Sequence, residues 1–293
     1  MKIKTYSVKS LIHLYKMELS SRYPGHEIMQ MIYFLFEEYM GWSKTSVHLS
    51  LNQEIPEKAM PSFTQALAEL TTGKPLQYVI GWTLFNGSRL TVNSSVLIPR
   101  PETEELCIII KSDCDRKPLP TLSILDIGTG TGCISIDLKK YFLNARVTGI
   151  DSSPEAINTA ILNARDNYCK IDFLVSDILN DNTWGNFGLY DLIVSNPPYV
   201  LETEKQKMNA NVIDFEPANA LFVPDDNPLL YYRSIAAFAK RHLIPGGLLY
   251  FEINEQFGLE TGNLVHDYGF DKVEVVMDIR GKDRFVRAIL SSP

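Results

Sequence analysis

Leu125-Asp126-Ile127-Gly128-Thr129-Gly130-Thr131-Gly132 joins a short apolar strand to a helix, and this stretch decides the class of fold. Its glycines allow the backbone to turn sharply and to approach a ligand closely, because glycine carries no side chain and tolerates positive φ. The spacing G-x-G-x-G, preceded by Asp126, differs from the G-x-G-x-x-G of dinucleotide-binding loops and disfavours a cradle for a pyrophosphate. A tight strand-to-helix turn without a ligand is the alternative.

Strand and helix patterns alternate on both sides of this loop, which predicts βαβ units in a parallel, doubly wound sheet. The last two strands, joined through Arg280-Gly281-Lys282, predict an antiparallel hairpin at one edge. The expected strands span residues 123–126, 145–151, 172–176, 189–195, 248–253, 273–277 and 285–290. The expected helices span residues 131–141, 154–168, 229–243 and 256–268.

Acidic residues stand where the next two expected strands end, Asp151 after the second and Asp177 after the third. In doubly wound sheets, ligands bind beyond the carboxyl ends of the strands. A carboxylate at Asp151 suits a ribose diol, because it accepts hydrogen bonds from two hydroxyl groups. Residues 151–155 also make a good helix start, and both roles are compatible if Ser152 or Ser153 caps the helix. For Asp177 the alternative is a surface turn.

Val194-Ser195-Asn196-Pro197-Pro198-Tyr199-Val200 marks the end of the fourth strand. Neither proline has an N–H group and both fix φ, so the chain bends stiffly and presents Asn196, the Pro197 carbonyl and the Tyr199 ring. Such a site accepts hydrogen bonds from a planar NH2 group while an aromatic ring packs on its plane. A Pro-Pro turn that closes a strand, with asparagine as an ordinary turn residue, is the alternative.

The first part of the chain predicts separate elements. Apolar residues recur at helix spacing from about residue 5 to 72, which indicates a small helical bundle. Residues 78–80 and 82–85 then form an expected extended segment before Asn86-Gly87, the strongest short-range signal for a hairpin. We therefore expect a helical bundle over residues 1–73, a β-hairpin connector over 74–96 and the α/β domain over 97–293.

Composition excludes several classes of protein. Hydrophobic residues make up 45% and charged residues 22% of the chain, as in soluble globular proteins, and no run approaches the length of a membrane span. The four cysteines show no C-x-x-C spacing and the histidines form no H-E-x-x-H, so we expect no metal site. We expect a soluble cytoplasmic protein that acts as a monomer, away from membranes and without direct binding of nucleic acid.

The strand ends, taken in order, resemble the motifs of Rossmann-like S-adenosylmethionine methyltransferases, and Asn-Pro-Pro-Tyr is the signature of those that methylate planar nitrogens. The chain also resembles the HemK/PrmC family of protein-(glutamine-N5) methyltransferases, which modify class 1 peptide chain release factors. The likeness runs from about Gly73 to the C-terminus. Its stretches are Gly73–Tyr78, Leu97–Glu104, Asp126–Gly132, Ser195–Tyr199, Phe215–Pro217 and Gly281–Arg284.

The resemblance implies a fold, a reaction and a set of contacts. The fold is a Rossmann-like class I α/β methyltransferase domain. The reaction transfers a methyl group from S-adenosyl-L-methionine to the glutamine of the release factor Gly-Gly-Gln loop, leaving S-adenosyl-L-homocysteine. Asn196 and Pro197 would hold the glutamine amide with Tyr199 beside it, and the helical bundle would dock the release factor. The implied cofactor contacts are Asp126, Gly128, Thr129, Gly130, Thr131, Gly132, Asp151, Asp177, Ile178 and Asn196.

The roles of four other residues are less specific: three of them have two possible roles, and the fourth has only a packing role. Arg100 and Glu102, which with Pro198 are implied substrate contacts, form either a surface pair or part of a wall over the pocket. Glu216 either braces the Asn196 loop or acts as a capping carboxylate before a proline. Ile178 stands where some family members carry an aromatic residue, so we expect only apolar packing there.

Two other functions are compatible with parts of the sequence. An adenine-N6 methyltransferase of DNA or RNA shares Asn-Pro-Pro-Tyr but needs a basic groove, which the net charge of -7 disfavours. A non-catalytic binding protein would keep the fold without the chemistry, and the intact glycine loop, Asp151 and Asn196 argue against it.

Overall fold

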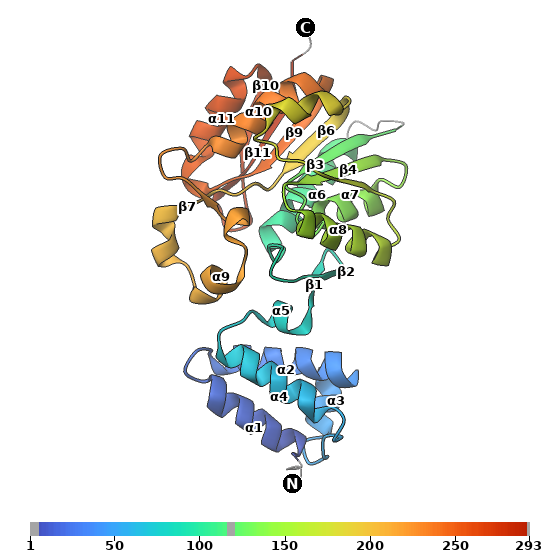
Figure 1. Cartoon of the computed structure of the whole chain (residues 1–293), viewed down its shortest axis with the longest axis vertical. Coiled ribbons are helices and arrows are strands. Elements are labelled where there is room, and N and C mark those ends of the chain that lie inside the picture. The colour runs from blue at the N-terminus through green and yellow to red at the C-terminus, as the bar shows by residue number, and fades with distance from the viewer. Residues whose placement is uncertain (1–5, 116–120, 292–293) are drawn as a thin grey trace. The chain divides into compact units, whose positions relative to one another are not determined.

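The computed structural model describes residues 6–115 and 121–291, which are drawn as ribbon in Figure 1. The chain divides into two compact units. One unit holds the chain up to Gly81 together with Asn209–Phe215, and the other holds Trp82–Met208 together with the chain from Glu216 onward. The division at Gly81 lies within the segment that we expected to be a connector.

The first unit is helical, as its apolar spacing predicted. Ser7 and Ser43 begin two of its helices by accepting a hydrogen bond from the backbone N–H group three residues on. Tyr15 and Phe63 lie in its buried core, where the Tyr15 hydroxyl donates to the Phe63 carbonyl at 2.6 Å. Its helices are α1 (Val8–Leu19), α2 (Gly25–Met40), α3 (Lys44–Leu49), α4 (Met60–Thr71), α5 (Leu76–Ile80) and α9 (Ala210–Phe215).

The prediction that residues 78–80 are extended is wrong, because they belong to the short helix α5. Pro75 precedes this helix and Gly81, at a φ of 81°, ends it. Val79 and Ile80 pack against the helical core, so tertiary packing overrides their preference for strands. The expected hairpin itself is confirmed: β1 (Trp82–Phe85) pairs with β2 (Ser88–Thr91) through Asn86-Gly87, both at positive φ.

The second unit is built on a seven-stranded sheet with the order β10-β11-β9-β6-β3-β4-β5 (Figure 1). The five strands from β9 to β5 are parallel, and β10 with β11 forms an antiparallel hairpin at one edge. The doubly wound α/β fold and its edge hairpin are therefore confirmed. The strands are β3 (Ser123–Ile127), β4 (Arg146–Asp151), β5 (Asp172–Val175), β6 (Tyr190–Ser195), β9 (Leu243–Glu252), β10 (Phe270–Met277) and β11 (Asp283–Leu290).

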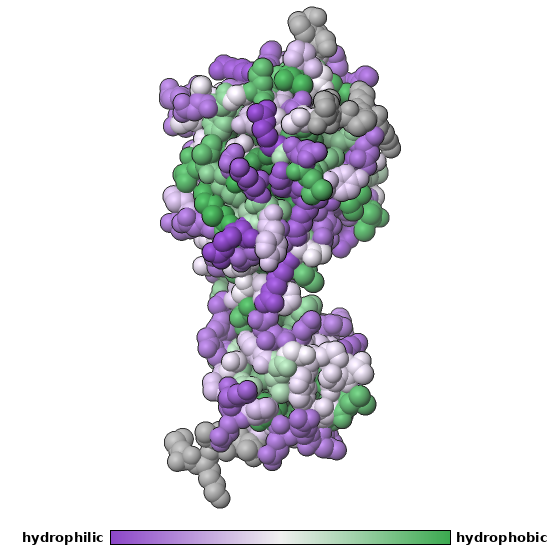
Figure 2. Space-filling model, turned by 90° about the vertical axis from the view of Figure 1, so that its right-hand side faces the viewer, coloured by the Kyte–Doolittle hydropathy of each residue, from purple (hydrophilic) through white to green (hydrophobic). Residues whose placement is uncertain are grey.

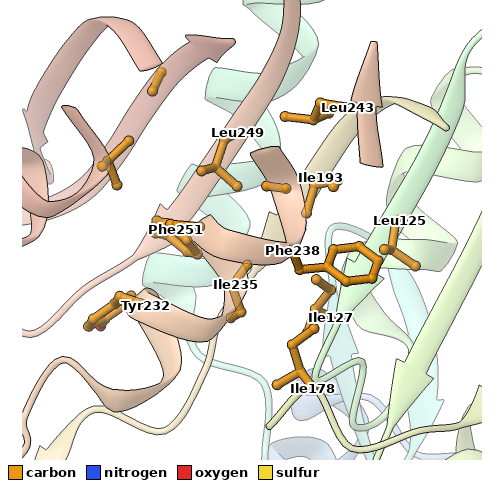
Figure 3. Packing of buried hydrophobic residues seen from close by; sticks show 14 of the residues in the cluster. Leu125, Ile127, Ile178, Ile193, Tyr232, Ile235, Phe238, Leu243, Leu249 and Phe251 are labelled. Carbon is orange, nitrogen blue, oxygen red and sulfur yellow. The ribbon is translucent and has the colours of Figure 1, made fainter. Parts of the chain in front are cut away.

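Successive residues of each inner strand point to opposite faces of the sheet, and each face has its own core. On one face Leu125 and Ile193 pack with α10 (Leu230–His242) and α11 (Gly258–Asp267). Figure 3 shows Phe238 of α10 close to Leu125 and Ile127. The other core includes Ile124 and Leu192 and is covered by α6 (Pro101–Asp115), α7 (Cys133–Tyr141) and α8 (Pro154–Asp166).

The chain also contains shorter elements, and only η4 among them overlaps an expected element, the helix over residues 256–268. β7 (Val200–Leu201) pairs in parallel with β8 (Phe222–Val223) just after the Asn-Pro-Pro-Tyr stretch. The 3-10 helices are η1 (Asp181–Asn186), η2 (Glu202–Lys207), η3 (Ala218–Ala220) and η4 (Glu255–Phe257). On the face seen in Figure 2, hydrophilic residues are spread over both units with hydrophobic residues scattered among them. Within the described ranges, each helix is too short or too polar to cross a bilayer.

Gly149 in β4 permits close packing between neighbouring strands. A Cβ atom at this position would lie 2.6 Å from Phe173 Cε1 and 2.9 Å from Thr129 Oγ1. Contacts this short force one of these groups to shift, and Phe173 packs against the core that α6, α7 and α8 cover. We expect Gly149→Ala to lower the free energy of unfolding by about 1–3 kcal/mol, measured by urea denaturation.

The matched control is Gly188→Ala, where an added Cβ would have no atom within 4 Å. This variant should unfold at the wild-type urea concentration. Equal stability of the two variants would contradict the packing constraint at Gly149.

Candidate active site

A cavity lies beyond the carboxyl ends of β3, β4, β5 and β6, at the point where the strand order reverses between β3 and β6. It encloses about 1000 Å³, including space open to solvent. Much of its wall comes from four stretches that follow these strands and one that precedes α6. The stretches are residues 127–131, 151–153, 176–178 and 195–198, and residues 95–97 with 99–100.

The glycine loop after β3 is tied to its neighbours by its own backbone. The N–H groups of Gly128 and Thr129 donate to the Ile150 carbonyl at 2.8 and 2.9 Å. On the far side Asn163 of α8 accepts from the Thr91 N–H group at 2.7 Å and donates to the carbonyls of Thr91 and Thr131, both at 3.0 Å. The loop is therefore held between β4, α8 and the hairpin.

Asp126 lies beneath this loop and is fully buried. Its Oδ2 atom accepts hydrogen bonds from the hydroxyls of Thr129 at 2.6 Å and Ser135 at 2.8 Å. Burial raises the pKa of Asp126 to about 6, and these hydrogen bonds oppose that rise. The side chain is not part of the cavity wall, and neither is Gly132, so both support the loop from behind.

Asp151 does line the cavity. Its two carboxylate oxygens accept from the N–H groups of Gly130 at 2.9 Å and Ser153 at 3.0 Å. Burial raises the pKa of Asp151, and these backbone hydrogen bonds lower it in part. The Ser153 hydroxyl caps α8 by accepting from the Ala156 N–H group at 3.1 Å. Ser153 therefore caps α8 while Asp151 keeps its carboxylate at the cavity, and both residues line the wall.

Asp177 and Ile178 follow β5 and also line the cavity. Asp177 is exposed and accepts from the Leu179 N–H group at 2.9 Å, whereas Ile178 is buried. Trp184 donates to the Ile178 carbonyl at 3.1 Å and fixes the turn. Tyr231 of α10 completes this part of the wall; no motif in the sequence pointed to it.

Asn196 reaches the cavity from the end of β6. Its Nδ2 atom donates to the Thr103 hydroxyl at 3.0 Å, and its Oδ1 atom accepts no hydrogen bond from any residue that the structure describes. Pro197 and Pro198 line the cavity beside it. The amide of Asn196 therefore has its donor end engaged and its acceptor end available.

Behind Asn196 lies a buried carboxyl group, Glu252, at the end of β9. The Thr103 hydroxyl donates to its Oε2 atom at 2.7 Å and the Tyr199 hydroxyl to its Oε1 atom at 3.0 Å. Burial raises the pKa of Glu252 to about 7, while these two hydrogen bonds lower it in part. Burial also raises the pKa of Tyr199, whose side chain turns to Glu252 and is not part of the cavity wall.

Arg100 lines the cavity and pairs with Glu216, not with Glu102: its Nη2 atom lies 2.6 Å from Glu216 Oε1. Glu216 is buried and also accepts from the Ile98 N–H group at 3.3 Å, so it braces residues 98–100 and not the Asn196 loop. Glu102 lies outside the cavity wall, 3.8 Å from Arg280. Across the described ranges, histidine, cysteine and acidic side chains do not gather into a group that could hold a metal ion.

Two regions of the chain match known protein families. Residues 17–81 match the PrmC N-terminal domain, and residues 114–222 match the Methyltransferase small domain. A 16S rRNA methyltransferase of T. thermophilus, solved with AdoMet and guanosine, shares the fold with a TM-score of 0.52 and 17% identity, covering 71% of this chain and 49% of that chain.

Two curated relatives cover nearly the whole chain. The release factor glutamine methyltransferase of Flavobacterium psychrophilum is 41% identical over 92% of this chain and 94% of its own length. That of Bacteroides thetaiotaomicron is 38% identical over 93% of this chain and 96% of its own length.

The raised pKa of Glu252 has a consequence for stability. Above the ordinary pKa of 4.5 the unfolded chain releases this proton, while the folded protein keeps it until about pH 7. The folded state then binds more protons, so the contribution of Glu252 to the free energy of unfolding falls as the pH rises through this window. Between about pH 4.5 and 8 we expect the stability of the wild type relative to Glu252→Gln to fall by on the order of 3 kcal/mol.

Urea unfolding of both proteins at a series of pH values measures this difference. Taking the difference removes the contribution of Asp126, whose pKa burial also raises and which both proteins share. A difference that does not change with pH would show that Glu252 titrates alike in the folded and unfolded states.

Proposed function

Since the chain belongs to the release factor glutamine methyltransferase family, we propose that it methylates the side-chain amide nitrogen, N5, of the glutamine in the Gly-Gly-Gln loop of class 1 peptide chain release factors. It is an S-adenosyl-L-methionine-dependent enzyme, and S-adenosyl-L-homocysteine is the second product. The structural observation that carries the choice of acceptor is the Asn196 amide, whose Oδ1 atom is left available at the cavity.

The cavity residues fit the cofactor. The backbone of Gly128–Thr131 forms a wall without bulky side chains, and an added Cβ at Gly130 would meet no atom within 4 Å. We propose that Asp151 accepts hydrogen bonds from the ribose hydroxyls and Asp177 from the adenine amino group, with Ile178 packed against the adenine plane. Asp126 and Gly132 would shape the loop from behind. When bound, the cofactor supplies an electrophilic methyl group on a sulfonium.

The acceptor amide nitrogen is a poor nucleophile, because its lone pair is delocalised into the carbonyl. We propose that Asn196 Oδ1 and the Pro197 carbonyl accept its two N–H groups and hold the lone pair towards the methyl group. Both acceptors bind more strongly as positive charge builds on the nitrogen, so they favour the transition state over the ground state. Alignment of two bound reactants accounts for up to about 7–11 kcal/mol of the barrier. One amide proton is released to solvent, to which the cavity is open, as the C–N bond forms or afterwards.

The remaining implied contacts keep more limited roles in this proposal. Pro198 and Arg100 line the cavity and would contact the segment that carries the glutamine, with Arg100 held by Glu216. Tyr199 would act from behind the wall through Glu252. We propose that the helical unit, which contains the match to the PrmC N-terminal domain, docks the release factor. An enzyme that acts on release factors works where they do, in the cytoplasm.

Methylation of a purified release factor tests the acceptor. We expect incubation with methyl-labelled S-adenosyl-L-methionine to place one methyl group on the loop glutamine, located by peptide mass mapping. A release factor in which this glutamine is replaced by alanine is the control and should take up no label. Label on another residue, or on nucleic acid offered in the same assay, would refute the proposed acceptor.

Replacement of Asn196 tests the role of its amide. We expect Asn196→Ala to lower kcat by about 10²–10³-fold, because it removes an acceptor that acts mainly in the transition state. The dissociation constant of the cofactor, measured by calorimetry, should change little. Asn263→Ala, at an exposed position of α11, is the control and should turn over like the wild type. Wild-type turnover in Asn196→Ala would remove Asn196 from the mechanism.

A further inference from the structure

We propose that Glu252, acting through the Thr103 hydroxyl, determines which end of the Asn196 amide faces the cavity. The inference rests on the proposed function, since it explains how Asn196 comes to accept a hydrogen bond from the acceptor amide. Thr103 and Glu252 are positioning residues in this scheme. They are remote in sequence from Asn196 and from each other, and the fold brings them together at the carboxyl ends of β6 and β9 and the first turn of α6.

An asparagine side chain has two ends of almost equal shape and opposite chemistry. Its oxygen accepts hydrogen bonds and its NH2 group donates them. A reversed Asn196 amide would fill the same space but would present donors to the N–H groups of the acceptor amide. Turnover by the enzyme therefore requires a contact that holds the Asn196 amide in one of its two orientations.

The Thr103 hydroxyl makes this selection, because it has only one proton to donate. Its oxygen lies 2.7 Å from Glu252 Oε2 and 3.0 Å from Asn196 Nδ2. An ionised carboxylate can only accept, so the hydroxyl proton must point to Glu252. The threonine oxygen then has only lone pairs to offer, and Asn196 must turn its NH2 group to them.

In its ionised form Glu252 accepts hydrogen bonds through both carboxylate oxygens. The Tyr199 hydroxyl occupies its other oxygen at 3.0 Å, and Tyr232 of α10 donates to its backbone carbonyl at 3.2 Å. Two charges act on it from neighbouring elements: Arg284 of β11 favours the ionised form and Glu102 of α6 disfavours it. Each oxygen of the ionised Glu252 carboxylate therefore accepts a hydrogen bond from one hydroxyl group.

The same chain of hydrogen bonds also strengthens the acceptor. An NH2 group that donates into a polarised hydroxyl draws more electron density onto its own carbonyl oxygen, since linked hydrogen bonds polarise one another. This polarisation makes Asn196 Oδ1 a better hydrogen-bond acceptor. The gain is largest in the transition state, where positive charge develops on the substrate nitrogen. Glu252 supplies this effect without touching the substrate.

Protonation of Glu252 removes the selection. A protonated carboxyl can donate to the threonine oxygen, after which the Thr103 proton is able to point to Asn196 and the amide is able to reverse. Since burial raises the pKa of Glu252 to about 7, the ordered state is gained as the pH rises through that value.

The test compares kcat for four variants in the full-length protein. We expect Thr103→Val, which removes the hydroxyl, and Glu252→Gln, which removes the charge, each to lower kcat by about 10–100-fold with little change in cofactor affinity. Thr103→Ser keeps the hydroxyl and should retain most of the rate. Thr261→Val is the matched control: Thr261 is equally buried, and its hydroxyl has no partner among the described residues.

Two further measurements separate positioning from general damage. The double variant Thr103→Val with Glu252→Gln should lose no more than either single variant, because both act through one chain of hydrogen bonds. The wild-type kcat should rise as the pH passes about 7, and this step should be absent in Glu252→Gln. Additive losses, or the same step in the variant, would overturn the proposal.

A spectroscopic readout does not depend on the substrate. The side-chain NH2 resonances of Asn196, assigned by their loss in Asn196→Ala, should shift with a midpoint near pH 7 in the wild type and not in Glu252→Gln. Absence of that shift in the wild type would overturn the proposal. Wild-type turnover in Thr103→Val and Glu252→Gln, with turnover lost in Asn196→Ala, would overturn it too and would leave the proposed function intact. If the release factor is not methylated, the proposed function fails, and the NMR titration still decides the orientation of the amide.

Discussion

The parallel pairing of β3 with β6 is the constraint on which the site depends. It sets Ile127 opposite Ser195, so the glycine loop and the Asn-Pro-Pro-Tyr bend begin at the same edge of the sheet. The Ser195 hydroxyl donates to the Ile127 carbonyl at 2.7 Å and ties the two strand ends together. Chain segments almost seventy residues apart are thereby held side by side over one cavity. A shift of this pairing by one residue would turn the buried side chains of β6 to the opposite faces of the sheet.

Two buried carboxyl groups organise the loops at this edge, and both do so through hydroxyl groups. Asp126 holds Thr129 of the glycine loop and Ser135 of α7, and Glu252 holds Thr103 and Tyr199 behind Asn196. A hydroxyl that donates its proton to a carboxylate can only accept from a third group, so the carboxylate also determines that the third group must be a donor. The cavity wall is in this way positioned by charges that lie outside it.

Local sequence patterns predicted most of the strands, helices and turns, because strand ends, glycine turns and Asn-Gly hairpins depend on a few consecutive residues. They failed where tertiary contacts decide. Residues 78–80 are helical because they pack on the helical core. β9 begins at Leu243, whereas the expected strand began at residue 248. The partners of Arg100 and Asn196, namely Glu216 and Thr103, lie about a hundred residues away along the chain, and no spacing rule joins them.

The Asn163 side chain couples the β1–β2 hairpin to the glycine loop. It makes hydrogen bonds with the Thr91 backbone on one side and with the Thr131 carbonyl on the other. The hairpin, α8 and the glycine loop are thereby connected directly. The stiffness of the loop therefore originates partly in a segment some forty residues upstream that never reaches the cavity. A substitution that displaces Thr91 would therefore loosen the glycine loop as well as the hairpin.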